Sequence, residues 1–285
     1  MKTRKSVLIT GANSGMGLAA SKAFARKGYR VIMLCRNEGR GVKALEAARE
    51  AAEDGEAVEL ELCDLSSLAS IRECSERLHA RMRSLDALVN NAGVIVPKRR
   101  ETKDGFELQL GVNHLGHFLL TNLLLDLMKA SRGRVVVVAS GAHKAGRIHW
   151  EDLQLKEGYS TIAAYGQAKL ANILFTRELA RRLEGSGVTA NCLHPGAVAT
   201  DMGVDRETGF GRLVTSLLKP FFLTPEEGVD TAVYLATSPE VEGLSGRYFY
   251  RRKPASISAR ASDDAAAARL WKLSEELTGL GTAIG

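Results

Sequence analysis

The stretch Thr10-Gly11-Ala12-Asn13-Ser14-Gly15-Met16-Gly17 decides the fold of this 285-residue chain. It follows the apolar run Val7-Leu8-Ile9, which predicts a buried strand, and it opens a predicted helix over residues 15–27. Glycine permits a tight turn and a close approach between the backbone and a ligand. The N-terminus of a helix offers free N–H groups and a positive dipole end to a phosphate. A turn with the spacing G-x-x-x-G-x-G between a strand and a helix therefore predicts a phosphate-binding site.

Predicted strands and helices alternate along most of the chain. The strands are expected at residues 6–10, 30–34, 57–62, 87–90, 134–140, 188–194 and 246–250. The helices are expected at residues 15–27, 38–53, 68–81, 105–129, 163–184 and 225–237. Several strands are almost wholly apolar, which is typical of a parallel sheet covered on both faces. The alternation predicts an α/β chain with a single-domain Rossmann fold, in which a doubly wound parallel sheet of about seven strands carries helices on both faces.

One domain is expected over residues 1–285, since no repeat, low-complexity linker or second boundary interrupts the alternation. Two long connections break it. Residues 141–160 contain a strand-like piece, Arg147-Ile-His-Trp150, and residues 195–222 are rich in Gly, Thr and apolar side chains. Such connections at the carboxyl ends of strands often cover ligands. We expect a substrate-covering insertion at about 197–223, whose apolar part is either a lid or a core helix, and a C-terminal helical tail at about 255–285.

The composition is that of an ordinary globular protein, with 45% hydrophobic and 25% charged residues. The net charge is +6, but Lys and Arg are scattered and no nucleic-acid-binding motif accompanies them, so no nucleic-acid partner is expected. The longest apolar stretches, 118–128 and 213–223, are interrupted by polar residues and fall short of the ~20 apolar residues of a membrane-spanning helix. The basic start of the sequence leads directly into a strand, so we expect neither a signal peptide nor an anchor, and a cytoplasmic location.

Neither the cysteines nor the histidines predict a metal site. No two cysteines have the spacing of metal ligands, and reduced, mostly buried thiols are expected for Cys35, Cys63, Cys74 and Cys192. The histidines that invite a metal hypothesis form no convincing ligand set with Asp, Glu or Cys; they are His114, His117, His143, His149 and His194. We interpret these histidines as structural or loop residues.

The end of the second strand indicates which dinucleotide would bind. A site that prefers NAD places an acidic residue about 20 residues after the glycine turn, to hold the ribose 2′-hydroxyl. Here Cys35 and Arg36 occupy that place, so no carboxylate repels a 2′-phosphate and a guanidinium is present to pair with it. NADP(H) is therefore the expected cofactor, unless Arg36 is only a solvated surface residue. Asp64, after the third strand, either accepts a hydrogen bond from the adenine amino group or caps the next helix.

Several motifs occur in an order that resembles the short-chain dehydrogenase/reductase family, from about residue 5 to about residue 250. They are Thr10 to Gly17, Asn90-Asn-Ala-Gly93, Asn113, Ser140, Tyr165-Gly-Gln-Ala-Lys169 and Pro195-Gly196. The resemblance implies cofactor contacts by Gly11, Asn13, Ser14, Gly15, Met16, Gly17, Arg36, Asn37, Asp64, Leu65, Asn91, Ala92, Gly93, Tyr165, Lys169, Pro195, Gly196, Val198 and Thr200. Any one of these motifs alone would be a weak signal.

The chemistry of four residues agrees with this resemblance. Carbonyl reduction needs a hydride donor at carbon and a proton donor at oxygen. An unassisted phenol has a pKa near 10, which a nearby ammonium lowers. Tyr165 and Lys169 are four residues apart on a predicted helix and so share one face. Ser140 closes a strand and is expected to polarise the substrate carbonyl. The resemblance implies that Asn113 supports a water-mediated proton path to Lys169.

The spacing of 25 residues between Ser140 and Tyr165, with the sequences around it, resembles the retinol dehydrogenase and WW-domain oxidoreductase-like branch. That resemblance implies a small apolar alcohol or carbonyl substrate, and a retinoid, steroid, fatty aldehyde, polyketide or aromatic ketone all fit. It also implies a homodimer or homotetramer through helices 105–129 and 163–184, a question that the segment after Tyr250 leaves open. The alternatives are a reductase of a polycyclic or polyketide-like metabolite, and a non-catalytic protein that senses NADP(H).

Overall fold

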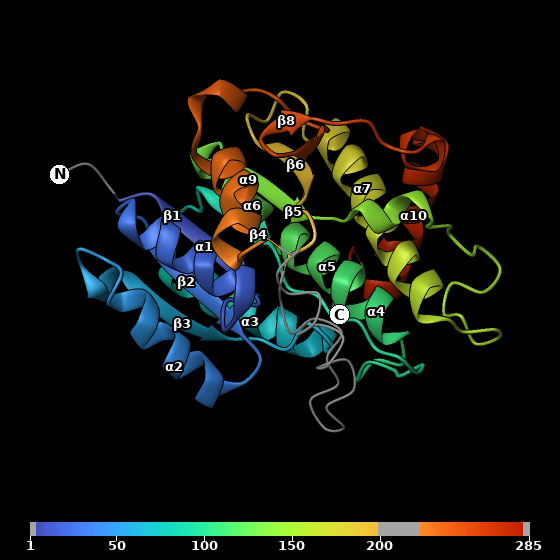
Figure 1. The fold of residues 1–285 in the computed structure, drawn as a ribbon, viewed down its shortest axis with the longest axis horizontal. Helices are drawn as coiled ribbons and strands as arrows, with labels where there is room; N and C mark the ends of the chain where they lie inside the picture. Colours follow the sequence, from blue (N-terminus) through green and yellow to red (C-terminus); the bar gives the residue numbers. More distant parts are fainter. Residues whose placement is uncertain (1–3, 199–222, 282–285) are drawn as a thin grey trace.

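The computed structural model describes residues 4–198 and 223–281, and within them one sheet has eight strands in the order β3-β2-β1-β4-β5-β6-β7-β8 (Figure 1). The strands are β1 (Ser6–Thr10), β2 (Arg30–Cys35), β3 (Val58–Leu62), β4 (Ala87–Asn90), β5 (Arg134–Val138), β6 (Thr189–His194), β7 (Tyr248–Tyr250) and β8 (Lys253–Pro254). All neighbours pair in parallel except β8, a short antiparallel strand beside β7. The predicted doubly wound parallel sheet is confirmed. Its strand order reverses between β1 and β4, where ligands bind in open α/β sheets.

Helices cover both faces of the sheet, as predicted (Figure 1). Successive side chains of β1 explain how both faces become apolar: Val7 and Ile9 pack on one face and Leu8 on the other. The first face carries α1 (Gly15–Arg26), α2 (Glu38–Arg49) and α9 (Pro225–Thr237). The second face carries α3 (Leu68–Arg81), α5 (Gly116–Leu123), α6 (Leu125–Ser131), α7 (Thr161–Arg182) and α10 (Asp264–Thr278).

The helix predicted at residues 105–129 is confirmed in part, because the helical segment begins at Leu108, contains a π-helical turn and breaks at Leu124. The chain forms a single turn, α4 (Leu108–Leu110), then a π-helical turn, η2 (Gly111–Leu115), and then α5 and α6. Glycines at both ends of η2 allow neighbouring segments to pack closely against it. A Cβ on Gly111 would lie 2.3 Å from Thr102 Cγ2, and a Cβ on Gly116 would lie 2.6 Å from the Leu65 carbonyl oxygen. Such π-helical turns occur frequently at functional sites.

The connection between β5 and α7 also differs from its prediction. Strand β5 ends at Val138, the short helix η3 (Gly141–Lys144) follows Ser140, and residues 147–150 form no strand. The buried Gln167 of α7 holds this connection in place. Its Oε1 accepts the backbone N–H of His149 at 2.8 Å, and its Nε2 donates to the Leu153 carbonyl at 2.9 Å. Long-range hydrogen bonds to α7 therefore replace the expected strand pairing.

Helix α10 lies along α7 near the C-terminal end of the described chain (Figure 1). Trp271 packs edge-on against Phe118 of α5 and stacks on Phe175 of α7, with ring centroids 4.9 Å and 5.9 Å apart. The predicted insertion at 197–223 falls almost wholly outside the described residues; at its ends, Val198 and Leu223 form a parallel bridge. No helix among the described residues has the length and apolar character needed to cross a membrane.

Candidate active site

The glycine turn between β1 and α1 is packed too closely for side chains. Gly11 has φ +66°, and a Cβ there would lie 2.9 Å from Ala92 Cα. A Cβ on Gly17 would lie 2.1 Å from the Gly11 carbonyl oxygen and 2.8 Å from Asn91 Nδ2. The turn thus lets α1 start directly against the end of β4. The free N–H groups at the start of α1 border a cavity.

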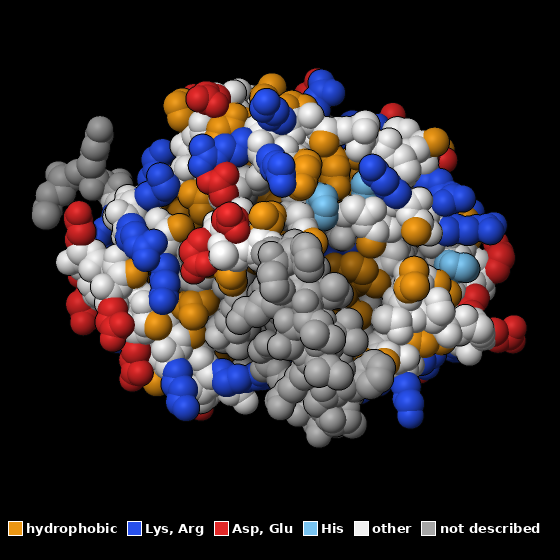
Figure 2. Space-filling model, in the orientation of Figure 1, with side chains coloured by type: hydrophobic (Ala, Val, Ile, Leu, Met, Phe, Trp, Pro, Cys, Tyr) orange, Lys and Arg blue, Asp and Glu red, His pale blue; other side chains and the backbone are white. Residues whose placement is uncertain are grey.

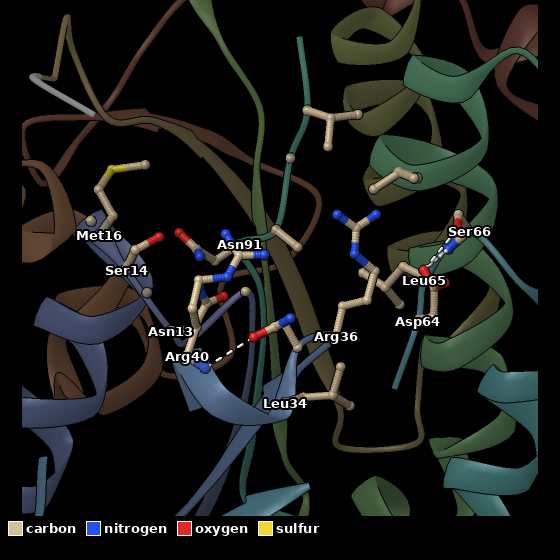
Figure 3. Close-up of a pocket in the computed structure, with 18 of the residues that line it drawn as sticks. Asn13, Ser14, Met16, Leu34, Arg36, Arg40, Asp64, Leu65, Ser66 and Asn91 are labelled. Carbon is tan, nitrogen blue, oxygen red and sulfur yellow. Dashed lines mark hydrogen bonds between the residues drawn. The ribbon is translucent and has the colours of Figure 1, made fainter. Parts of the chain in front are cut away.

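This cavity has a volume of about 550 Å³ and lies where the strand order reverses (Figure 3). It has the size of a small-molecule or cofactor site. The residues predicted for the cofactor that line it are Gly11, Asn13, Ser14, Gly15, Met16, Gly17, Arg36, Asn37, Asp64, Leu65, Asn91, Ala92 and Gly93. They come from the carboxyl ends of β1, β2, β3 and β4, which the sheet brings together.

Two guanidinium groups border the cavity at the end of β2, although the sequence interpretation named only one. Arg36 follows β2, and Arg40 lies in the first turn of α2; both side chains reach into the cavity (Figure 3). The Asn37 side chain caps α2 by accepting the Arg40 backbone N–H at 3.0 Å. The spacing of four residues at the start of a predicted helix was the signal for Arg40, because it places Arg40 on the same side as Arg36.

Asp64 does not cap α3, so the interpretation of Asp64 as a helix cap is wrong. The N-cap is Ser67, whose hydroxyl accepts the Ser70 backbone N–H. Asp64 Oδ1 instead accepts the backbone N–H and the hydroxyl of Ser66, at 3.0 Å and 2.7 Å. Burial by itself would raise the pKa of Asp64, but the hydrogen bonds from Ser66, together with nearby Lys103 and Arg36, hold that pKa below its ordinary value. Asp64 is therefore a carboxylate on the wall of the cavity.

The structure brings Ser140, Tyr165 and Lys169 together beyond one end of β5. Ser140 and Tyr165 share a hydrogen bond. The Lys169 Nζ lies 5.6 Å from the centroid of the Tyr165 ring, over its face, and donates to the Val138 carbonyl at 2.9 Å. Lys169 is 1% exposed, and its burial lowers its pKa to about 8. This lysine keeps its proton at neutral pH and places a positive charge against the phenol.

The expected lowering of the Tyr165 pKa is not observed. Burial raises the pKa of the phenol, and the hydrogen bond with Ser140 opposes this only in part. The position of the ammonium explains the difference, because Lys169 faces the ring and directs an N–H to Val138. The protonated phenol is therefore the stable form of this site near neutral pH.

Asn113 lies fully buried in η2 and uses its whole side-chain amide on one neighbour. Its Oδ1 accepts the Val94 backbone N–H at 2.7 Å, and its Nδ2 donates to the Val94 carbonyl at 3.0 Å. The amide therefore fixes the segment after β4 that lines the cavity. The Asn113 backbone carbonyl accepts a hydrogen bond from His117 at 3.1 Å.

Not every predicted cofactor residue borders the cavity. Tyr165, Lys169, Pro195, Gly196 and Val198 lie outside its lining, and Thr200 falls outside the described residues. The cavity thus corresponds to one part of the expected dinucleotide site. Its lining also includes residues that the sequence interpretation missed, among them Ser66, Val94, Ile95, Val96, Val112 and Pro225. None of these residues carries a sequence signal of its own.

The remaining polar groups give no sign of a metal centre in the described part of the chain. No group of three or more His, Cys, Asp or Glu side chains there could hold a metal ion. All four cysteines are free and buried. The Lys and Arg side chains are spread over the face shown in Figure 2 and form no single basic patch there.

The chain is similar to known proteins over most of its length. A family model described as short chain dehydrogenase matches residues 5–209. Retinol dehydrogenase 14 of Homo sapiens is 49% identical over 97% of this chain and 87% of its own length. Retinol dehydrogenase 12 of Mus musculus is 44% identical over 97% of this chain and 87% of its own length.

Two solved structures share the fold. An uncharacterized protein from Mycobacterium paratuberculosis has a TM-score of 0.77 and 36% identity, covering 96% of this chain and 93% of its own. A short chain dehydrogenase from Pseudomonas syringae has a TM-score of 0.68 and 26% identity, covering 86% and 93%. The glycine turn, the cavity at the strand reversal and the Ser140–Tyr165–Lys169 group thus occur in a chain that belongs to the short-chain dehydrogenase family of oxidoreductases and is retinol dehydrogenase-like.

Proposed function

We propose that this protein is an NADP(H)-dependent oxidoreductase that interconverts an apolar carbonyl compound and its alcohol, with Tyr165 as the acid and base. The observation that carries the proposal is that Ser140, Tyr165 and Lys169 lie together in a chain whose glycine turn borders a cavity at the carboxyl ends of the strands. The family supplies the coarser expectation of a nicotinamide cofactor. The tight contacts at Gly11 and Gly17 hold the start of α1 directly beside the cavity, where its N–H groups would suit a pyrophosphate.

The proposed reaction transfers a hydride at the substrate carbon and a proton at the substrate oxygen. A bound nicotinamide supplies or accepts a hydride at the substrate carbon. In the reducing direction, the Tyr165 O–H protonates the carbonyl oxygen while the Ser140 hydroxyl hydrogen-bonds that oxygen. The Lys169 ammonium, buried and protonated below about pH 8, stabilises the phenolate that remains. The phenol is protonated at rest, as a proton donor must be. The direction of the reaction follows the cofactor ratio, and a preference for NADP(H) favours reduction.

The first test replaces the acid. Tyr165→Phe should lower kcat about 10³-fold, the scale expected for loss of a general acid, while NADPH binding stays within about twofold. Turnover is followed by NADPH absorbance with apolar aldehydes and ketones. The matched control is Tyr234→Phe on α9, which removes a hydroxyl that donates to Glu240. Full activity in Tyr165→Phe would remove Tyr165 from the acid/base role, and no turnover of any substrate by the wild type would favour a non-catalytic NADP(H) sensor.

The preference for NADP(H) rests on Arg36 and Arg40. The residues that β2 and α2 contribute to the cavity include no acidic side chain, and the two guanidiniums there suit a 2′-phosphate. Arg36→Ala and Arg40→Ala should each raise the KM for NADPH about tenfold, because a charge-assisted hydrogen bond contributes ~1.5 kcal/mol or more. The KM for NADH should stay nearly constant. Lys43→Ala, an exposed cation further along α2, serves as the control. Equal effects on both cofactors would exclude this phosphate site.

The substrate class is proposed as small and apolar. Ile95 and Val96 line the cavity, and Ile162 lies 77% exposed one helical turn before Tyr165. The relatives named retinol dehydrogenases make a retinoid one candidate. A polycyclic or polyketide-like ketone is the second candidate, and a substrate panel containing both classes separates them by kcat/KM.

Location and assembly remain part of the proposal. Four free, buried cysteines suit a reducing compartment such as the cytoplasm. The family resemblance implies a homodimer or homotetramer, but α10 covers parts of α5 and α7 through Trp271. We therefore propose that any homo-oligomer forms through a face other than the one beneath α10.

A further inference from the structure

His117 is a buried histidine whose two ring nitrogens contact two different parts of the site. The residue lies on α5 and is 1% exposed. Its Nε2 is 2.8 Å from the hydroxyl oxygen of Thr10, at the end of β1. Its Nδ1 is 3.1 Å from the backbone carbonyl oxygen of Asn113, in η2. One imidazole therefore links the strand that enters the glycine turn to the turn that carries Asn113.

The partners determine where the imidazole proton lies. The Asn113 carbonyl can only accept, so His117 Nδ1 must donate. The Thr10 hydroxyl oxygen already accepts the backbone N–H groups of Asn91 and Ala92, each at 2.9 Å. Its own proton is then free to be donated to His117 Nε2. A neutral ring with its proton on Nδ1 satisfies every donor and acceptor in this group.

Other protonation states fit these contacts less well. A proton on Nε2 would direct a third N–H at the Thr10 oxygen and force the hydroxyl toward the Val89 carbonyl, which is further away at 3.4 Å. Burial, together with the charge of nearby Lys169, lowers the pKa of His117 to about 4. The other titratable neighbour, His114, is itself buried, and burial lowers its pKa to about 3. The electrostatic surroundings thus also favour the neutral ring.

We propose that His117 is a positioning residue that holds Asn113, the expected support of the proton path to Lys169, in register with the Asn91–Ala92 turn on the wall of the cavity. The inference rests on the proposed function, because it assigns His117 a role in that site. Loss of the imidazole would take a side-chain donor from the Asn113 carbonyl. It would also leave the Thr10 hydroxyl proton with only the more distant Val89 carbonyl, at 3.4 Å, as its acceptor. Both ends of the link between β1 and η2 would then be free to shift.

The first experiment measures the tautomer and the protonation state of the His117 imidazole. In the full-length protein with ¹⁵N-labelled histidine, His117 should give the spectrum of the Nδ1–H tautomer, with Nε2 unprotonated, and should not titrate between pH 5 and 8. Its signal is assigned by comparison with His117→Asn, and His114→Asn provides the control assignment. A proton on Nε2, or a titration near pH 6.5, would overturn the proposal. This measurement does not depend on any variant keeping its activity.

The second experiment separates the two contacts. Asn at position 117 keeps a donor near Asn113 but is too short to reach Thr10, whereas Gln places an amide near Thr10. His117→Asn should retain kcat within about threefold and weaken NADPH binding about tenfold, and His117→Gln should show the reverse. His117→Leu should lower kcat and weaken NADPH binding together. Equal behaviour of the Asn and Gln variants would show a merely structural role and overturn the proposal.

The two proposals fail in different ways. If Tyr165→Phe abolishes turnover while the Asn and Gln variants behave alike, the oxidoreductase assignment stands and the role of His117 falls. If Tyr165→Phe keeps full activity, the proposed acid is wrong whatever the His117 variants do. His79→Asn is the matched control in the kinetic assay, since that partly exposed imidazole on α3 bonds Asp126 of α6 at 2.9 Å.

Discussion

Single residues set the chemistry of this site through what surrounds them. Lys169 and Tyr165 are ordinary residues in the sequence, yet burial lowers the pKa of the lysine to about 8 and raises that of the phenol. The four-residue spacing predicted their proximity. The direction of the Tyr165 shift could not be predicted, because desolvation depends on how tightly α7 packs beneath the connection from β5.

Gly17 offers a prediction at this scale. A Cβ there would lie 2.1 Å from a backbone oxygen of Gly11, so Gly17→Ala must push α1 away from the turn. We expect a loss of stability of about 1–3 kcal/mol, the cost of overpacking, together with loss of measurable NADPH binding. Urea unfolding and a fluorescence titration with NADPH measure the two effects.

Gly39 provides the matched control, because it is helical and a Cβ there would have its nearest neighbour 3.9 Å away. Gly39→Ala should stabilise the chain by about 0.5–1 kcal/mol through helix propensity. A Gly17→Ala protein that binds NADPH as the wild type does would contradict the packing argument.

At the scale of elements, the second face of the sheet is assembled from helices that are far apart in sequence. α10 joins α5 and α7 through aromatic rings, and the Arg182 guanidinium lies 4.4 Å from the Trp271 ring centroid. The His114–Ser274 hydrogen bond attaches the same helix to η2. The C-terminal helix is therefore bound to the turn that carries Asn113.

Trp271→Ala should lower the free energy of unfolding by about 3–5 kcal/mol, as expected for removal of a large buried aromatic side chain. Because α10 contacts η2, kcat should fall as well. Lys272→Ala, its exposed neighbour on α10, should change neither quantity measurably. Urea unfolding with steady-state kinetics tests this, and a stability loss below about 1 kcal/mol would contradict the packing role of α10.

For the whole molecule, two fully buried neutral histidines make stability depend on pH. Burial lowers the pKa of His114 to about 3 and that of His117 to about 4, from an ordinary value of 6.5. Below pH 6.5 these histidines bind protons in the unfolded chain, but they do not bind protons in the folded chain until about pH 4. Folding stability therefore falls as the pH drops through this window, by about 2 kcal/mol for each histidine at pH 5.

Urea unfolding at pH 7 and pH 5 measures this dependence. His114→Gln removes one titrating group, so its stability should fall about 2 kcal/mol less than that of the wild type between the two pH values. The difference between the two proteins isolates the histidine from the carboxylates, which both share. An unchanged pH dependence in His114→Gln would show that His114 binds protons equally in the folded and unfolded chains, so that burial does not lower its pKa.

The sequence by itself determined the parallel sheet, the glycine turn and the pairing of Tyr165 with Lys169. Each follows from a local sequence pattern: apolar runs, glycine spacing and a four-residue interval. Only the tertiary structure decided that Arg40 joins Arg36 in the cavity, that η2 interrupts the expected long helix, and that His117 meets Thr10 from 107 residues away. The physical reason is that burial and hydrogen-bond partners come from segments that the sheet brings together, and local periodicity carries no information about those contacts.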